Sequence, residues 1–449
     1  MNGFFGFSQR GTSLRTEIVA GLTTFMTMAY IIFVNPSILA TEGTGLPASG
    51  VVFATCVAAS AASIAMGMVA NFPIALASGL GLNAVVAYTL ILGLGLEWQT
   101  AMAAIILEGL LITALVLTNL REAVLNAVPL SLKFAIAVGI GLFIAFIGLK
   151  NSGIVVSDET NYLALGDFTS GAVLLAAFGL IVTLALVARG MRGGLLAGIL
   201  LTGITGIITG VIPPPETLVD FNFDTSTIGG GVLALPDVFQ LTLLPVVFAL
   251  FMTDFFDTMG TMIAVAQEGD LLDEEGRVSN AKRILLVDSL SAVGGGAAGA
   301  SSVTAYVESG SGVAEGGRTG FSSVVVGVMF LLALPFAPLI AVFGGSVPVA
   351  GPEGGELLVS PVTAPALVVV GFLMMTSVRF IPWDRFDEAI PAFLTILTLP
   401  LTFNIAYGIG FGFISYVLIK LARGRPGEAH PLIYVVAGMF VLAFLESAL

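Results

Sequence analysis

The chain has 449 residues, 57% of them hydrophobic and only 10% charged, and its mean hydropathy is +1.05. Soluble domains are about 45–50% apolar and about 25% charged, so this composition excludes a soluble protein and leaves no room for a separate soluble domain. The only cysteine, Cys56, and the only histidine, His430, exclude intramolecular disulfides, Cys/His metal sites and Cys–His or Ser–His catalysis. We therefore expect a membrane protein that is not an enzyme and has no metal and no cofactor.

The formal net charge is −13, with only four lysines against 29 acidic residues. Two interpretations of this acidity stay open. One is drift, and the other is adaptation to high salt, in which an acidic, lysine-poor surface stays hydrated while its charges are screened.

Apolar runs of about 20 residues recur along nearly the whole chain, each long enough to cross ~30 Å of hydrocarbon. The first 15 residues lack the features of a signal peptide, so we expect the first helix, from about Ile18, to act as an uncleaved insertion signal. A further apolar stretch at 431–446 either spans the membrane or lies in its interface. The runs predict an all-α polytopic membrane protein with fourteen transmembrane helices, near 18–40, 51–70, 72–90, 97–118, 130–149, 170–188, 193–212, 240–266, 281–298, 301–316, 319–343, 360–378, 387–402 and 405–422.

The basic residues predict the orientation of these helices. With a cytoplasmic N-terminus, fifteen of the sixteen lysines and arginines fall on the cytoplasmic side, and only Lys150 falls outside. Such an excess of inside charge is typical of a multi-pass protein of the cell membrane, and it supports the helix count because one miscounted helix would scatter the later charges. The inside set is Arg10, Arg15, Arg121, Lys133, Arg189, Arg192, Arg277, Lys282, Arg283, Arg318, Arg379, Arg385, Lys420, Arg423 and Arg425.

The two halves of the chain resemble each other. Each has two ordinary helices, a third segment interrupted by glycine and serine, a fourth helix and then three more. The interrupted segments are NFPIALASGLGLNAVVAYTL (71–90) and GASSVTAYVESGSGVAEGGRTG (299–320). Because seven helices per repeat is an odd number, the second repeat must be inverted in the membrane. We expect the broken third and tenth segments to contain short extended pieces that face each other and find backbone partners there.

Six carboxylates lie within the apolar segments, namely Glu108, Asp254, Asp257, Asp288, Glu308 and Glu315. A charge at bilayer depth costs at least ~2.5–3.5 kcal/mol, so intramembrane acids usually mark a substrate or ion pathway. Asp254 and Asp257 are three residues apart on one helix, with Cβ atoms ~5–6 Å apart. Repulsion and desolvation favour a proton on one of them, as a proton-coupled carrier needs. The alternative is a structural pair hydrogen-bonded to Thr253, Thr258 and Thr261.

Polar residues at the two breaks are candidates for substrate contacts. Glu308 can accept two hydrogen bonds at once, which suits adjacent N–H donors of a heterocycle, and Asn83 offers amide donors and an acceptor. The small residues before Asn83 equally fit plain close helix packing. Phe255 or Phe256 could stack on a flat ring, although core or lipid-facing positions are commoner for phenylalanine.

Three other acidic features have simpler explanations. Glu108 and Asp288 are possible structural partners for polar backbone. For Glu315 we expect a terminal ion pair with Arg318. The loop GDLLDEEGRVSN (269–280) lacks the ligand spacing of a calcium site, so we interpret it as a solvated cytoplasmic turn.

Four motifs together resemble the AzgA-like purine permeases, which are nucleobase–proton symporters with the fold of the uracil and xanthine permeases. The resemblance runs from about residue 4 to the C-terminus. The motifs are GLTTFMTMAYIIFVNPSIL (21–39), ASGLGLNAVVAYT (77–89), FMTDFFDTMGT (251–261) and YVESGSGVAEGGRTG (306–320).

The resemblance implies a core domain that moves past a gate domain like an elevator. The core would comprise residues 1–125 and 237–345, and the gate residues 126–236 and 346–449. By the same resemblance, Asn83, Asp254 and Glu308 contact the substrate and Asp257 couples transport. The implied substrates are adenine, guanine and hypoxanthine. Ser309, which follows Glu308 where the uracil and xanthine branch has asparagine, favours the purine branch.

The residues also bear on several alternatives to purine transport. An intramembrane aspartyl protease is disfavoured because it places its aspartates on different helices, whereas Asp254 and Asp257 share one. A sulfate-type anion carrier of this fold is disfavoured because it needs a site with few carboxylates. A channel or receptor is disfavoured because it does not explain the inverted repeat. A uracil or xanthine permease is a closer alternative. The sequence leaves open which purine is preferred, whether proton or sodium couples transport, and whether the protein forms a homodimer. No nucleic-acid partner is expected.

Overall fold

A computed structural model describes residues 2–118, 128–239, 243–273, 277–278, 280–351 and 355–447. Three predictions fall wholly or partly outside these residues. They concern the cytoplasmic position of Arg121, the domain boundary at 125–126 and the loop 269–280. The helices of the first half are α1 (Asn2–Phe5), α2 (Leu14–Met28), α3 (Ile31–Leu39), α4 (Ala48–Ala65), η1 (Met66–Ala70), α5 (Leu80–Ala84), η2 (Val85–Gly93), α6 (Trp98–Thr118), α8 (Leu130–Asn151), α9 (Gly171–Ala188) and α10 (Gly194–Ile208).

The second half repeats this arrangement. Its helices are α11 (Gly230–Leu233), η3 (Leu235–Val238), α12 (Leu244–Glu268), α13 (Ala281–Ala298), α14 (Ser309–Ala314), α15 (Gly320–Ala333), η5 (Leu334–Phe336), α16 (Ala337–Gly344), α17 (Ala364–Met375), η7 (Thr376–Phe380), α18 (Phe386–Thr402), α19 (Ile405–Ala422), η8 (Pro426–Glu428) and α20 (Pro431–Ser447). The strands are β1 (Leu76–Ser78), β2 (Val155–Asp158), β3 (Tyr162–Leu165), β4 (Val303–Ala305), β5 (Val347–Ala350) and β6 (Glu356–Val359).

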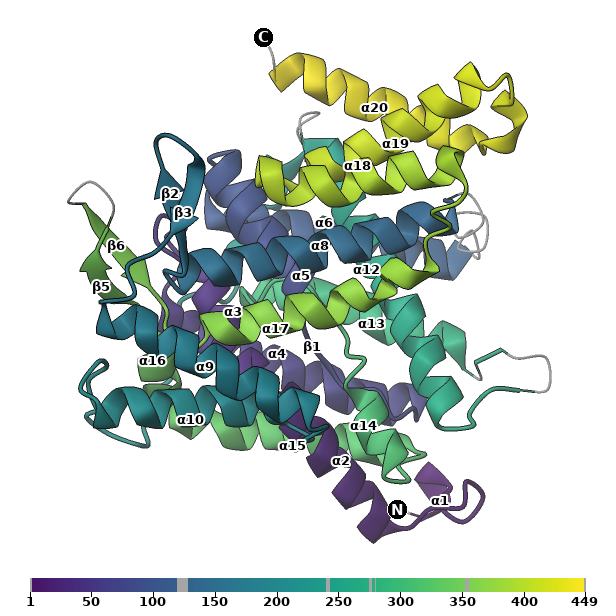
Figure 1. Cartoon of the computed structure of the whole chain (residues 1–449). Coiled ribbons are helices and arrows are strands. Elements are labelled where there is room, and N and C mark those ends of the chain that lie inside the picture. Colours follow the sequence, from purple (N-terminus) through teal and green to yellow (C-terminus); the bar gives the residue numbers. More distant parts are fainter. Residues whose placement is uncertain are drawn as a thin grey trace.

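The predicted polytopic helical architecture is confirmed. Each predicted segment overlaps a helix or a run of consecutive helices, and the two broken segments each combine a strand with helical pieces. Within the described residues, eight helices are long and apolar enough to cross a membrane, and four shorter apolar helices accompany them. Figure 1 shows the hairpins β2–β3 and β5–β6 at one end of the helices, with α1 and the loop after α12 towards the opposite end.

The two broken segments meet inside the molecule as predicted. β1 pairs with β4 in antiparallel register, with Ala77 opposite Thr304. Two further backbone bonds extend the ladder, from Gly79 N to Ser302 O (2.9 Å) and from Tyr306 N to Ala75 O (3.0 Å). Extended backbone inside a membrane bundle must find its partners within the protein, and these two strands supply them to each other.

The first helix departs from its predicted boundaries. It begins at Leu14 rather than near Ile18, and the Ser13 hydroxyl caps it by accepting from Thr16 N at 3.2 Å. Glu17 is therefore a buried carboxylate of α2, in addition to the six acids expected within the apolar segments. The helical run is also divided, because α2 ends at Met28 and α3 begins at Ile31.

Helix packing separates two groups of elements. The helices α2, α4, α6, α12, α13, α14 and α15 pack mainly on one another, and so do α8, α9, α17, α18 and α19. The C-terminal helix α20 packs against α19 and also touches α12. In Figure 1, α20 lies at the top of the molecule beyond α19.

Candidate functional site

Glu308 lies between the second extended segment and α14, where the chain changes direction. Its Oε1 accepts a hydrogen bond from the Tyr30 hydroxyl at 2.7 Å, and its side chain is partly exposed. The preceding residue, Val307, is 58% exposed. The carboxylate is therefore held by one donor and keeps acceptor capacity on its accessible side.

Asp257 and Asp254 differ in their surroundings although they are one turn apart on α12. Asp257 is exposed, and it interacts electrostatically with Glu308 and Asp254. Asp254 is fully buried, with the Ser302 hydroxyl 3.4 Å from its Oδ2 and the side chains of Glu108 and Thr304 also close to it. The two side chains therefore face different environments. This differs from the expectation that Asp254 stands level with Glu308 on the substrate side.

A second group of acids lies inside the first set of helices. Glu108 of α6 and Asp254 are both 0% exposed, and Asp288 of α13 is 2% exposed. Glu108 interacts with both aspartates and with Ser302. The structural hydrogen bonds predicted for the α12 aspartates occur instead at Asp288, whose Oδ2 accepts from Thr258 at 2.7 Å.

The other predicted site residues have distinct environments. Asn83 on α5 is fully buried, and both of its side-chain polar atoms lack a hydrogen-bond partner. The Ser309 hydroxyl accepts from Ala75 N at 3.0 Å, so it links the two broken segments. Phe255 is buried and stacked on Phe251 with ring centroids 5.6 Å apart, which leaves no free face for substrate.

The partner predicted for Glu315 is wrong. Glu315 forms its ion pair with Arg192, in the connection between α9 and α10, rather than with Arg318. The Arg318 guanidinium donates instead to the carbonyls of Val313 and Gly317. Sequence proximity suggested Arg318, whereas the fold brings a distant loop to Glu315.

Three important polar residues were missed in the sequence. Tyr30 binds Glu308, as described above. Asn35 of α3 donates to Thr55 Oγ1 (2.8 Å) and Ser78 Oγ (3.1 Å), which ties α3 to α4 and β1. Glu17 accepts from three backbone N–H groups near the start of α15. The sequence offered one signal, since Tyr30 and Asn35 are polar residues within an apolar run.

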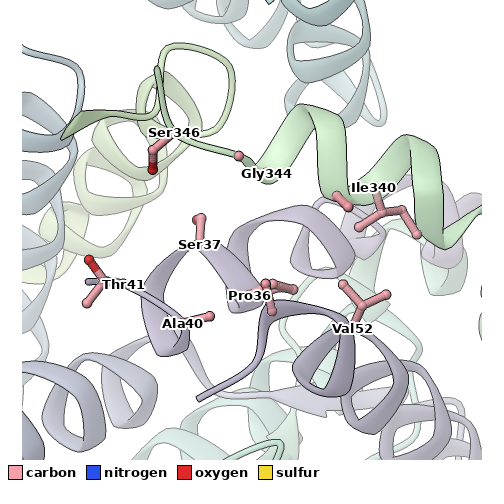
Figure 2. Close-up of a pocket in the computed structure, with 11 residues that line it drawn as sticks. Pro36, Ser37, Ala40, Thr41, Val52, Ile340, Gly344 and Ser346 are labelled. Carbon is pink, nitrogen blue, oxygen red and sulfur yellow. The ribbon is translucent and has the colours of Figure 1, made fainter. Parts of the chain in front are cut away.

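A hollow in the described part of the chain lies apart from these acids. Figure 2 shows it between α3, α4 and α16, where about 200 Å³ is lined by residues that include Pro36, Ser37, Val52 and Ile340. None of the predicted site residues lines it. We therefore take the accessible carboxylates of Asp257 and Glu308 as the candidate functional groups.

Comparisons with known proteins agree with this architecture. A protein-family model described as "Permease family" matches residues 15–411. A guanine/hypoxanthine permease of Bacillus subtilis (strain 168) is 43% identical over 453 residues, which cover 99% of this chain and 99% of that protein. An adenine permease of Escherichia coli (strain K12) is 40% identical over 455 residues, covering 99% of this chain and 96% of that protein.

Solved structures support the fold. The transmembrane domain of the cyanobacterial bicarbonate transporter BicA matches with a TM-score of 0.62 at 15% identity, covering 88% of this chain and 97% of that chain. Murine Slc26a9, an anion transporter in the inward-facing state, matches with a TM-score of 0.61 at 9% identity, covering 91% of this chain and 69% of that chain. At these identities the likeness concerns the fold alone. The match over residues 15–411 and the full-length relatives show that this chain belongs to the permease family, as a multi-pass membrane transport protein and not an enzyme.

Proposed function

We propose that this protein takes up purine nucleobases by proton symport across the cell membrane, with its N-terminus in the cytoplasm. The observation that carries the proposal is the full-length similarity to permeases named for guanine, hypoxanthine and adenine. A purine offers ring and exocyclic N–H donors beside acceptor nitrogens. Accessible carboxylates and an amide are suitable partners for such a ring.

Asp257, Glu308 and Asn83 are the proposed substrate contacts. Asp257 and Glu308 are accessible acceptors that interact with each other, and α5 and α14 both pack against α12. Asn83 is a buried amide without a partner, a state that costs about 1–3 kcal/mol unless a ligand supplies the missing bonds. Since Asp254 is buried away from the accessible side, we assign the substrate contact to Asp257, which reverses the division expected from the resemblance.

Movement of a core against a gate is the proposed transport step. The core comprises residues 1–125 and 237–345, and the gate residues 126–236 and 346–449. Denser packing within each set than between the sets supports a rigid-body motion. The ion pair between Arg192 of the proposed gate and Glu315 of the proposed core would break and re-form in each cycle.

Uptake of radiolabelled adenine, guanine and hypoxanthine into a permease-deficient strain tests this function. Uptake should follow an inward proton gradient and collapse with a protonophore. A Glu159→Gln variant, altered at an exposed acid of the β2–β3 turn, serves as the control and should transport normally. Uptake that is inhibited by sulfate or bicarbonate but not by unlabelled purines would contradict the assignment of purines as the substrate. Uptake that follows a sodium gradient at fixed pH would contradict the assignment of the proton as the coupling ion.

A further inference from the structure

Glu108 and Asp254 form a buried carboxyl pair that the substrate contacts do not use. The two groups lie on α6 and α12, and their side chains are close enough for a hydrogen bond between them. Neither oxygen of Glu108 has a donor, and Asp254 Oδ1 has none either. Within the described residues, no lysine or arginine forms an ion pair with either acid.

Asp288 differs from this pair, because it is buried nearby but accepts hydrogen bonds from several donors. Its Oδ2 accepts from Thr258 Oγ1 at 2.7 Å. Its Oδ1 accepts from Ala305 N at 2.9 Å and from Thr304 Oγ1 at 3.4 Å. A carboxylate with these three donors is stabilised as an anion. Asp288 therefore has hydrogen-bond donors on both oxygens, whereas Glu108 has a donor on neither.

Glu108 has no donor and Asp254 Oδ2 has a long contact of 3.4 Å from Ser302, so charges on both facing carboxylates would be poorly compensated. An ionised carboxyl group only accepts, so a hydrogen bond between Glu108 and Asp254 requires a proton on one of them. Two unit charges ~4 Å apart repel by about 4 kcal/mol at an effective dielectric constant of 20, and burial adds several kcal/mol per ion. One bound proton removes the repulsion and the burial cost of one of the two charges, and its O–H stabilises the remaining carboxylate.

We propose that Glu108 and Asp254 bind one proton between them and thereby form the proton-binding site of the core. The protonated member donates its O–H to the other carboxylate. A metal ion is a poorer occupant, since the described residues contain no group of three acid, cysteine or histidine side chains arranged to hold one.

The groups around the pair are consistent with this assignment. Asp288 faces it from α13, Asp257 lies one turn along α12, and the hydroxyl of Ser302 approaches from the segment before β4. The basic residues of α13, Lys282 and Arg283, are exposed at its first turn. Asp257 is exposed and interacts with Asp254, so it can pass protons between the accessible side and the pair. This last role rests on the proposed symport.

Infrared spectroscopy of the purified protein tests the site without any transport assay. At neutral pH the wild-type protein should show the C=O stretch of a buried protonated carboxyl group, shifted by deuterium exchange. Glu108→Gln and Asp254→Asn should each remove that band, and both amides mimic the neutral form, so both variants should elute as folded protein. Glu268→Gln, altered at an exposed acid at the end of α12, should leave the band unchanged.

Three outcomes would overturn the proposal. One is the absence of the band from the wild-type protein, and another is its survival in both Glu108→Gln and Asp254→Asn. The third is sodium binding, measured with radioactive sodium, that Glu108→Gln abolishes. Because these readouts need no substrate, they separate failure of the proton site from failure of purine transport. In vesicles, Glu108→Gln should exchange purine across the membrane but lose accumulation driven by a proton gradient.

Discussion

The Tyr30 hydroxyl donates to Glu308 Oε1 at 2.7 Å, which connects the junction of α2 and α3 to the break before α14. Tyr30 is itself buried, so its ring and hydroxyl are fixed by packing. One oxygen of Glu308 is thus oriented by the protein, and the remaining acceptor capacity is available to a ligand. This contact motivates the first prediction.

Glu308→Gln should weaken purine uptake sharply while the protein stays in the membrane. The amide replaces one acceptor with a donor, and a lost hydrogen bond to a charged group costs about 1.5–3 kcal/mol, or roughly 10- to 100-fold in affinity. Concentration dependence of uptake measures the change. Tyr30→Phe should cost less, since the carboxylate is retained. Wild-type affinity in Glu308→Gln would remove Glu308 from the site.

Asp257→Asn should abolish equilibrium binding of purine to the purified protein, whereas Asp254→Asn should retain binding and lose accumulation. Asp257 is accessible beside Glu308, and Asp254 is buried beside Glu108. Binding to purified variants, set beside uptake into vesicles, separates the two roles. The opposite pattern would restore the division suggested by the resemblance, and equal loss of binding would show that the pair acts as one unit.

Glu17→Ala should lower the thermal stability of the purified protein. The Glu17 carboxylate accepts from the backbone N–H groups of Arg318 (2.8 Å), Thr319 (3.1 Å) and Ser322 (3.2 Å). The N–H groups of Thr319 and Ser322 are buried, and a buried N–H group left without a partner costs about 1–3 kcal/mol, so we expect a loss of roughly 2–6 kcal/mol. Glu17→Gln keeps an acceptor and should be milder. Glu42→Ala, at an exposed acid, is the control, and an equal melting temperature in all three variants would contradict the capping role.

A disulfide between cysteines placed at 192 and 315 should stop transport. Arg192 and Glu315 form an ion pair that joins the proposed gate to the proposed core. The native Cys56 is buried and can be replaced by alanine in the background protein. Oxidation of the double-cysteine variant should abolish uptake, and a reducing agent should restore it. Each single-cysteine variant provides a control. Full transport by the cross-linked protein would exclude relative motion at this contact.

The sequence by itself determined the membrane class, the order of the helices and the positions of the two breaks. Apolar length fixes which segments can span hydrocarbon, because the bilayer sets a minimum helix length. The interruptions at 71–90 and 299–320 were visible because Gly and Ser replace the apolar residues that spanning helices need. The intramembrane acids were recognisable for the same reason, since their burial is costly and therefore rare.

Only the tertiary structure decided which acids share an environment. Asp254 and Asp257 look equivalent at a spacing of three, but the rotation between them turns one towards Glu108 and leaves the other accessible. Glu315 is paired with Arg192 rather than its sequence neighbour, and Glu17 reaches α15 across some three hundred residues. These partners come from helices that are distant in the chain. Local pattern carries no information about them, because side-chain direction and helix packing are set by the whole fold.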